Sequence, residues 1–300
     1  MGEAMTELPY VRQPVDFSAP VRYAHGRDSY LQPGVPRGAI HEYEWAASRV
    51  FPGTTRRYWV YVPVQYTPEE PASLMVFQDG RMYLDPEGEI RAAIVFDNLI
   101  HRGEVPATIG VFVDPGEPDN RNVEYDAFTD AYATFLQTEI LPNVQDSYRI
   151  SEDPDQWAIC GGSAGACCAF TVAWMRPDRF RRVLTLLGGD DFYPELIQET
   201  PRKPLRIFLQ SATRDLNWDA AEVNWVSISL RIAAALMERG YDVRLVLGDG
   251  GHDPNHGGAI LPDALRWLWR PVAKLDDPEI SPREVLRRAS PLGRDRPIEG

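Results

Sequence analysis

Short apolar runs alternate along the chain with segments whose apolar residues recur at helical spacing. Unbroken apolar runs flanked by turn residues are typical of parallel strands that are buried on both faces and joined by helices. We therefore expect buried parallel strands at residues 74–78, 109–113, 157–160, 183–187, 206–211 and 243–247. Two earlier runs, at residues 42–48 and 57–62, predict an antiparallel hairpin that turns across residues 51–53.

Three further segments predict helices. A helix at residues 220–239 is expected to end at Gly240, and another at residues 260–269 follows the last strand. The third lies between the strands at 109–113 and 157–160, where six residues form one apolar helix face: Phe128, Ala131, Tyr132, Phe135, Leu136 and Ile140. This alternation predicts an α/β fold, a doubly wound and mostly parallel sheet with helices on both faces.

The two ends of the chain differ in composition from the part between them. Residues 1–40 are rich in Pro, Gly, Tyr and Arg without periodicity, which predicts an extended arm and favours a homodimer over a monomer. Residues 41–273 form the expected catalytic domain, and residues 274–300 a charged tail. In that tail Ser281, Pro282 and Glu284 predict the start of one short helix.

Charge and composition exclude several classes of protein. The 300 residues carry 31 basic and 44 acidic side chains, and the net charge of −13 offers no footprint for nucleic acid or an anionic membrane. No run is long enough to span a membrane, and the first residues do not resemble a signal peptide, so we expect a cytoplasmic protein. Cys160, Cys167 and Cys168 share one apolar segment and are interpreted as reduced core residues.

The strongest chemical signal is the sequence Gly161-Gly162-Ser163-Ala164-Gly165, which stands between a predicted strand and a helix-forming segment. A tight turn there lifts a serine hydroxyl out of the sheet, as a nucleophile elbow requires. The turn also places the Ala164 amide at a helix N-terminus, where it can donate to an oxyanion. The alternative is a glycine-rich turn with a capping serine.

A serine nucleophile needs a base, and His252 follows the last predicted strand, after Ser163 in the chain. His256, expected in the same loop, is the competitor, either as the base or as a residue that shapes the pocket. The other histidines precede the core or lie in a helix-to-loop segment, and we interpret them as surface or structural residues: His25, His41 and His101.

An acid must orient the imidazole of the base. Asp215 follows the predicted strand at 206–211 and precedes His252 by one strand-helix unit. Asp190 and Asp191, after the strand at 183–187, are the alternative acids. If Asp215 has no catalytic role, it caps a loop.

The second donor of an oxyanion hole should come from the loop after the strand at 74–78. The chain there reads Gln78-Asp79-Gly80-Arg81, and the flexibility of Gly80 would release the Arg81 amide for this purpose. Asp79 would brace the turn. The alternative is an ordinary Asp-Gly turn.

Several ordered motifs now resemble one family. VFQDG, FDNLI, RNVEY, GGSAG, RDLNW, and GGH followed by HGGAILPDALRWLW are similar to those of the enterochelin esterase-like (esterase D) group of α/β hydrolases, over about residues 40–270. The resemblance implies the α/β-hydrolase fold and a serine esterase. It also implies that Ser163 is the nucleophile, Asp215 the acid and His252 the base, with an oxyanion hole formed by the amides of Arg81 and Ala164. Because the roughly 40 residues before this region are too few to form the large N-terminal β domain of some members, we expect no counterpart of that domain in them.

Further residues match this family pattern and should lie near the site: Arg121, Glu124 and Tyr125. An internal ion pair that fixes their loop is favoured over contact with substrate. Trp218 and Trp225 flank the Asp215 loop, where either could wall an acyl or aryl pocket, although burial alone also explains an aromatic residue.

Other functions have weaker support. A metal hydrolase would need His252, Asp253, His256 and Asp249 as ligands, but no HExxH sequence is present and Pro254 should break any helix there. We expect neither a metal nor a cofactor, because the glycine spacing also fails the dinucleotide pattern. A small or aryl ester is the expected partner. An acyltransferase or lactonase with the same triad, and a non-catalytic protein of this fold, remain alternatives.

Overall fold

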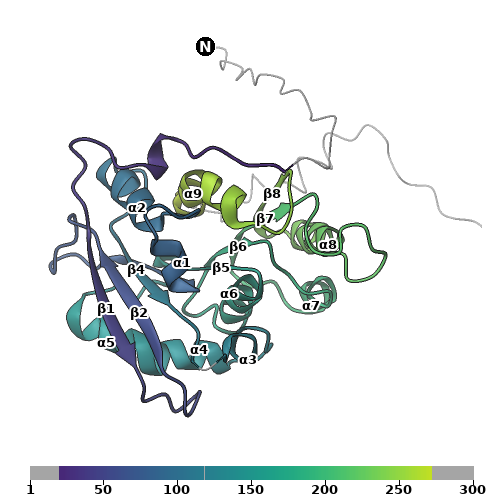
Figure 1. The fold of residues 1–300 in the computed structure, drawn as a ribbon. Coiled ribbons are helices and arrows are strands. Elements are labelled where there is room, and N and C mark those ends of the chain that lie inside the picture. The colour runs from purple at the N-terminus through teal and green to yellow at the C-terminus, as the bar shows by residue number, and fades with distance from the viewer. Residues whose placement is uncertain (1–19, 118, 272–300) are drawn as a thin grey trace, which may run out of the picture. The chain divides into compact units, whose positions relative to one another are not determined.

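An eight-stranded sheet organises the part of the chain that the computed structural model describes, residues 20–117 and 119–271 (Figure 1). Its order is β1-β2-β4-β3-β5-β6-β7-β8; β1 and β4 pair antiparallel with β2, and the other neighbours pair in parallel. The strands are β1 (Ala39–Trp45), β2 (Arg56–Val62), β3 (Ser73–Gln78), β4 (Thr108–Val113), β5 (Trp157–Gly162), β6 (Arg182–Leu186), β7 (Arg206–Ala212) and β8 (Asp242–Gly248).

The strands confirm the predicted α/β class, and each predicted strand overlaps one observed strand. All residues of β3 and β4 are buried, as expected for strands covered on both faces. The chain runs from β3 to β4 on one side and returns to β5 on the other, so the loops after β3 and β5 diverge. In parallel sheets this switch point is where ligands bind.

Helices cover both faces of the sheet, with α2 and α9 on one face and α4 to α8 on the other (Figure 1). The helices are η1 (Arg27–Ser29), α1 (Gly80–Leu84), α2 (Ala92–His101), α3 (Arg121–Tyr125), α4 (Ala131–Phe135), η2 (Leu136–Ile140), α5 (Leu141–Ser147), η3 (Pro154–Gln156), α6 (Ala164–Met175), α7 (Tyr193–Glu199), α8 (Trp225–Glu238) and α9 (Pro254–Trp269). Within the described residues, no helix is long and apolar enough to cross a membrane.

Three predicted helices have different bounds in the structure. The segment at 128–140 is not one helix, because α4 passes into the π-helical η2, and Glu139 in η2 accepts the Arg49 and Val50 amides. The helix predicted from 220 begins at Trp225, where the Asn224 side chain accepts the Ser227 amide and caps the helix.

The prediction that Pro254 breaks the last helix is wrong. Helix α9 begins at Pro254, six residues before the predicted start at 260, and His256 therefore lies on a helix and not in a loop. Proline fits the first position of a helix because the amide hydrogen that it lacks would have no intrahelical acceptor there.

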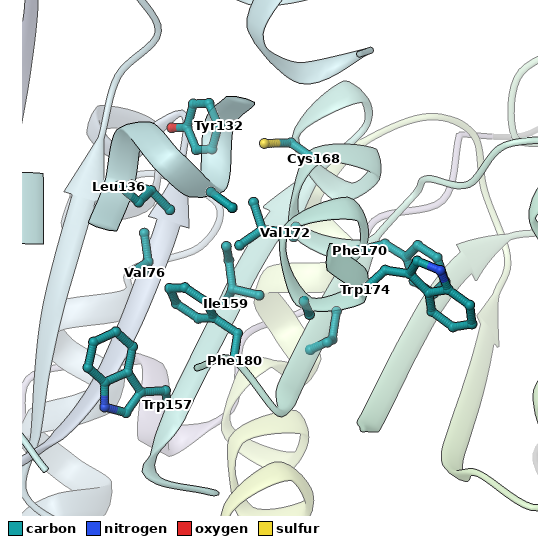
Figure 2. Close-up of a cluster of buried hydrophobic side chains, with 14 of the residues drawn as sticks. Val76, Tyr132, Leu136, Trp157, Ile159, Cys168, Phe170, Val172, Trp174 and Phe180 are labelled. Carbon is teal, nitrogen blue, oxygen red and sulfur yellow. The ribbon is translucent and has the colours of Figure 1, made fainter. Parts of the chain in front are cut away.

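The apolar core fixes α6 against the sheet. Figure 2 shows Val76 of β3 and Ile159 of β5 in one buried cluster with Val172 of α6. Cys160 and Cys168 are buried, Cys167 is half-buried, and all three are unpaired thiols. Because the core holds both β5 and α6, it also holds the turn that joins them.

Residues 20–38, part of the predicted arm, lie against α2 and α9 (Figure 1). The Asn98 side chain on α2 donates to the carbonyls of Asp28 and Tyr30. Asn255 on α9 pairs with the backbone of Tyr23. The short helix predicted at Ser281 lies outside the described residues.

Candidate active site

Ser163 occupies a strained turn between β5 and α6. Its backbone angles are φ 58° and ψ −127°, a combination that residues with a side chain rarely adopt. A Cβ atom added to Gly161 would lie 2.0 Å from the carbonyl oxygen of Gly165, so only glycine fits at 161. The Ser163 amide donates to the Leu186 carbonyl of β6 at 2.9 Å, which ties the turn to the sheet.

Two hydrogen bonds link Ser163 to a histidine and an aspartate from neighbouring strand ends. Ser163 Oγ lies 3.0 Å from His252 Nε2, and His252 Nδ1 lies 2.6 Å from Asp215 Oδ1. Asp215 follows β7 and is 1% exposed, and His252 follows β8. In this arrangement Nε2 can take the serine proton while the carboxylate faces the imidazolium that forms.

The contacts of Asp215 fix its orientation. Oδ1 also accepts the Leu216 amide at 2.8 Å, whereas Oδ2 is buried and has no hydrogen-bond partner among the described residues. Asp190 and Asp191, the alternative acids, lie after β6, and neither is bonded to His252. The structure therefore brings Asp215 to the histidine.

The two proposed oxyanion donors differ in their surroundings. Ala164 is the first residue of α6, where its amide has no intrahelical acceptor. The Arg81 amide, expected to be open, donates to Asp114 Oδ1 at 2.9 Å. The sequence analysis did not identify Asp114. Its position directly after a buried strand is the signal that could have found it.

Gly80 serves packing and not flexibility, contrary to the sequence interpretation. It lies in α1, and a Cβ atom there would meet the Phe112 carbonyl carbon at 2.3 Å. Glycine at position 80 thus lets α1 approach β4, which brings the Arg81 amide within reach of Asp114.

Asp79 braces the turn before α1. Arg121 binds it through two bonds, Nε to Oδ1 and Nη2 to Oδ2, both 2.7 Å long. The Asp79 amide donates to the Tyr125 hydroxyl at 3.1 Å. The ion pair therefore joins the loop after β3 to the loop after β4, beside Ser163.

Glu124 is buried away from the cleft. It pairs with Arg56 of β2, and both side chains are 0% exposed. Glu124 also accepts the Gly116 amide and the Asn120 side-chain amide, so this carboxylate fixes the loop that carries Arg121.

The two tryptophans and His256 have separate surroundings. Trp225 meets the His252 ring edge-on, with centroids 5.4 Å apart. Trp218 is 51% exposed, and neither tryptophan is among the residues that line the cleft around Ser163. His256 is buried, with Nδ1 3.1 Å from Gln210 Nε2, and is not bonded to Ser163.

A cleft of about 1210 Å³ opens in front of Ser163 and His252. Its walls come from β1, β2, α1 and the loops after β3, β4 and β6. Its lining includes Asp79, Arg81 and Arg121 from the predicted site. No sequence pattern predicted the wall that β1 and β2 contribute, whose cleft residues are Ile40, Glu42, Arg57 and Trp59.

Comparisons with known proteins agree with this fold. The family model described as "Putative esterase" matches residues 50–239. The iron(III) enterobactin esterase of Dickeya dadantii (strain 3937) is 28% identical over 254 residues, which are 76% of this chain and 54% of that protein. The iron(III) enterobactin esterase of Escherichia coli (strain K12) is 25% identical and is covered over 61% of its length. The chain thus spans between half and two thirds of these curated relatives.

Solved structures share the α/β-hydrolase fold. The enterobactin esterase of Shigella flexneri, solved in the presence of enterobactin, aligns with a TM-score of 0.69 at 23% identity, over 84% of this chain and 63% of that one. A feruloyl esterase module from Clostridium thermocellum complexed with sinapinate aligns with a TM-score of 0.63 at 16% identity, over 86% of this chain and 98% of that one. These similarities confirm the predicted fold.

Proposed function

The chain belongs to the Esterase family, and from this premise we propose that it is a serine carboxylic-ester hydrolase that forms an acyl-enzyme intermediate. The observation that carries the proposal is the chain of hydrogen bonds from Ser163 Oγ through His252 to Asp215, at a strained turn facing a cleft. Nucleophile, base and acid stand in the roles that acyl transfer requires.

Acylation uses each of these groups once. His252 Nε2 takes the hydroxyl proton as Ser163 Oγ forms a bond to the ester carbonyl carbon. The Ala164 amide stabilises the oxyanion, joined by the Arg81 amide when the carbonyl oxygen takes the place of the Asp114 carboxylate. The C–O bond to the alcohol then breaks, and the alcohol leaves with the proton held by His252.

Deacylation repeats these steps with water. His252 takes a proton from water as the water oxygen attacks the acyl carbon. The bond from the acyl carbon to Ser163 Oγ then breaks, and Ser163 Oγ takes the proton from His252. The acid is released and the enzyme restored. Asp215 holds the imidazole orientation in both steps and stabilises the charged form of the imidazole.

We propose a small or aryl ester as the substrate. Relatives named enterobactin esterase and feruloyl esterase support an aryl-containing substrate, and the apolar part of the cleft lining fits one. These apolar residues include Ile40, Trp59, Met82, Leu84, Ile90, Leu186 and Leu187.

The test is hydrolysis by the purified wild type and Ser163→Ala. The panel holds 4-nitrophenyl acetate, butyrate and octanoate, methyl ferulate, a catecholate trilactone and a simple lactone. Ser163→Ala should lower kcat by about 10⁴ or more, because only binding and the oxyanion hole remain. Ser147→Ala, at the exposed end of α5, is the matched control. Turnover by Ser163→Ala close to that of the wild type would refute the proposal.

A further inference from the structure

Asp114 places a carboxylate beside the proposed reaction centre. It directly follows β4, and it lines the same cleft as Ser163 and His252. Its Oδ1 accepts the Arg81 amide at 2.9 Å, and Arg81 is the second proposed oxyanion donor. A substrate oxygen that binds this amide therefore arrives next to a carboxylate.

Charged groups of both signs surround Asp114. Asp79 after β3, Arg57 of β2 and Arg81 of α1 are the charged side chains that act on it. Arg57 is paired with Glu42, and Asp79 with Arg121. Burial is the largest cause that raises the pKa of Asp114, and the Asp79 charge adds to it, whereas the Arg81 amide and the charges of Arg57 and Arg81 act in the opposite direction.

The cleft lining as a whole carries a negative net charge. Carboxylates outnumber guanidinium groups in the lining: Glu42, Asp79, Asp85, Glu89, Asp114 and Glu117 stand against Arg57, Arg81 and Arg121. Glu89 is further paired with Arg22 from the arm. Once these pairs are set aside, the described cleft residues leave three carboxylates, those of Asp85, Asp114 and Glu117, against one guanidinium, that of Arg81.

We infer that Asp114 makes this site select its esters by charge, accepting neutral or cationic esters with an apolar body and excluding anionic ones. The inference rests on the proposed function and names the substrate class of the same site. An anionic group on the acyl chain meets the surplus carboxylates of the cleft, Asp114 among them, where like charges repel more strongly than in water. A cationic group gains the opposite interaction, while the apolar wall contacts the uncharged body.

The test compares three 4-nitrophenyl esters with the same six-carbon acyl chain. The hexanoate is neutral, the monoester of adipate carries a terminal carboxylate, and the 6-(trimethylammonio)hexanoate carries a terminal cation. Release of 4-nitrophenolate is followed in low salt at neutral pH, with spontaneous hydrolysis subtracted. We expect kcat/KM for the hexanoate to exceed that for the adipate monoester by about tenfold or more, and the cationic ester to match or exceed the hexanoate.

Asp114→Asn assigns this selectivity to one carboxylate. The variant should raise the ratio of adipate to hexanoate kcat/KM by about tenfold. Asp146→Asn, an exposed position on α5 outside the cleft, removes the same charge and should leave the ratio unchanged. In the wild type, added salt should bring kcat/KM for the adipate monoester closer to that for the hexanoate, because screening weakens the repulsion. The same addition should change this ratio less in Asp114→Asn.

The outcomes separate the inference from the function on which it rests. No turnover of the hexanoate by wild type would refute the proposed function. Turnover of all three esters with equal kcat/KM would leave that function intact and refute charge selection. A wild-type preference that Asp114→Asn does not change would refute the role of Asp114. If Asp114→Asn does not fold, the wild-type ratio and its salt dependence still test charge selection.

Discussion

The ring of Tyr23 stacks on the imidazole of His256, with centroids 4.2 Å apart and planes inclined by 26°. The Tyr23 hydroxyl accepts the Asp249 amide at 2.6 Å, and the Tyr23 backbone pairs with the Asn255 side chain. Asp249 and Asn255 lie on either side of His252. One residue of the arm thus holds both ends of the loop that carries the proposed base.

Tyr23→Ala should lower kcat by about tenfold, because α9 loses the stacking contact at His256 and the His252 loop loses a hydrogen bond of about 1 kcal/mol at Asp249. Tyr23→Phe keeps the ring and should lose less. Steady-state kinetics on a neutral ester separate kcat from KM. Tyr30→Phe, an exposed arm tyrosine, is the control. Wild-type kcat in Tyr23→Ala would show that the arm does not position the base.

Asp215→Asn should lower kcat by about 10⁴, because an amide at this position favours the wrong imidazole tautomer and cannot stabilise the imidazolium. Asp190→Asn is the comparison, since Asp190 follows the neighbouring strand and is not bonded to His252. It should retain most of the activity. The opposite ranking of the two variants would assign the acid to Asp190.

Glu124→Gln should lower the free energy of unfolding by about 3–5 kcal/mol, because it leaves the Arg56 guanidinium buried without its counter-charge. Urea unfolding followed by tryptophan fluorescence measures the change. Glu117→Gln, an exposed change within the same loop, should stay within about 0.5 kcal/mol of wild type. Equal stability of both variants would contradict this account of the loop.

His256 should make stability depend on pH. Burial lowers the pKa of His256, with Asp249 acting in the opposite direction. Below about pH 6.5 the unfolded chain therefore binds a proton that the folded protein does not, so stability falls as the pH falls through this range. His256→Asn should lose less unfolding free energy between pH 7.5 and pH 5.5 than wild type does. Equal losses would show that His256 does not take part.

Local sequence patterns predicted much of the fold and of the site. Strands such as β3 and β4 are buried along their whole length, so an unbroken apolar run is enough to locate them. The turn at Ser163 requires glycine at position 161 because the Gly165 carbonyl lies so close, and this requirement is visible as a motif. The order of Ser163, Asp215 and His252 along the chain also matches strand ends that meet at one edge of the sheet.

The contact between Arg81 and Asp114 could not be predicted from the sequence, because it depends on which strands are neighbours in the sheet. Gln78 of β3 pairs with Val113 of β4, so Arg81 and Asp114 emerge side by side, and this register is a tertiary property. The start of α9 was predicted too late because Pro254 was expected to break a helix. Proline does so inside a helix, but at the first position it can begin one. The role of Trp218 in a pocket wall stays open in the sequence, because its apolar character does not reveal which way the loop turns the side chain, which is 51% exposed.

The most direct test of the central claim is covalent labelling of Ser163 by a 4-nitrophenyl alkylphosphonate ester. Ser163 Oγ would form a bond to phosphorus, 4-nitrophenolate would leave, and intact mass with peptide mapping would locate the adduct. We predict one phosphonyl group per chain, on Ser163, with loss of esterase activity in step with labelling and slower labelling of Asp215→Asn. Labelling of another residue with the same loss of activity, or full activity after Ser163 is modified, would contradict the account.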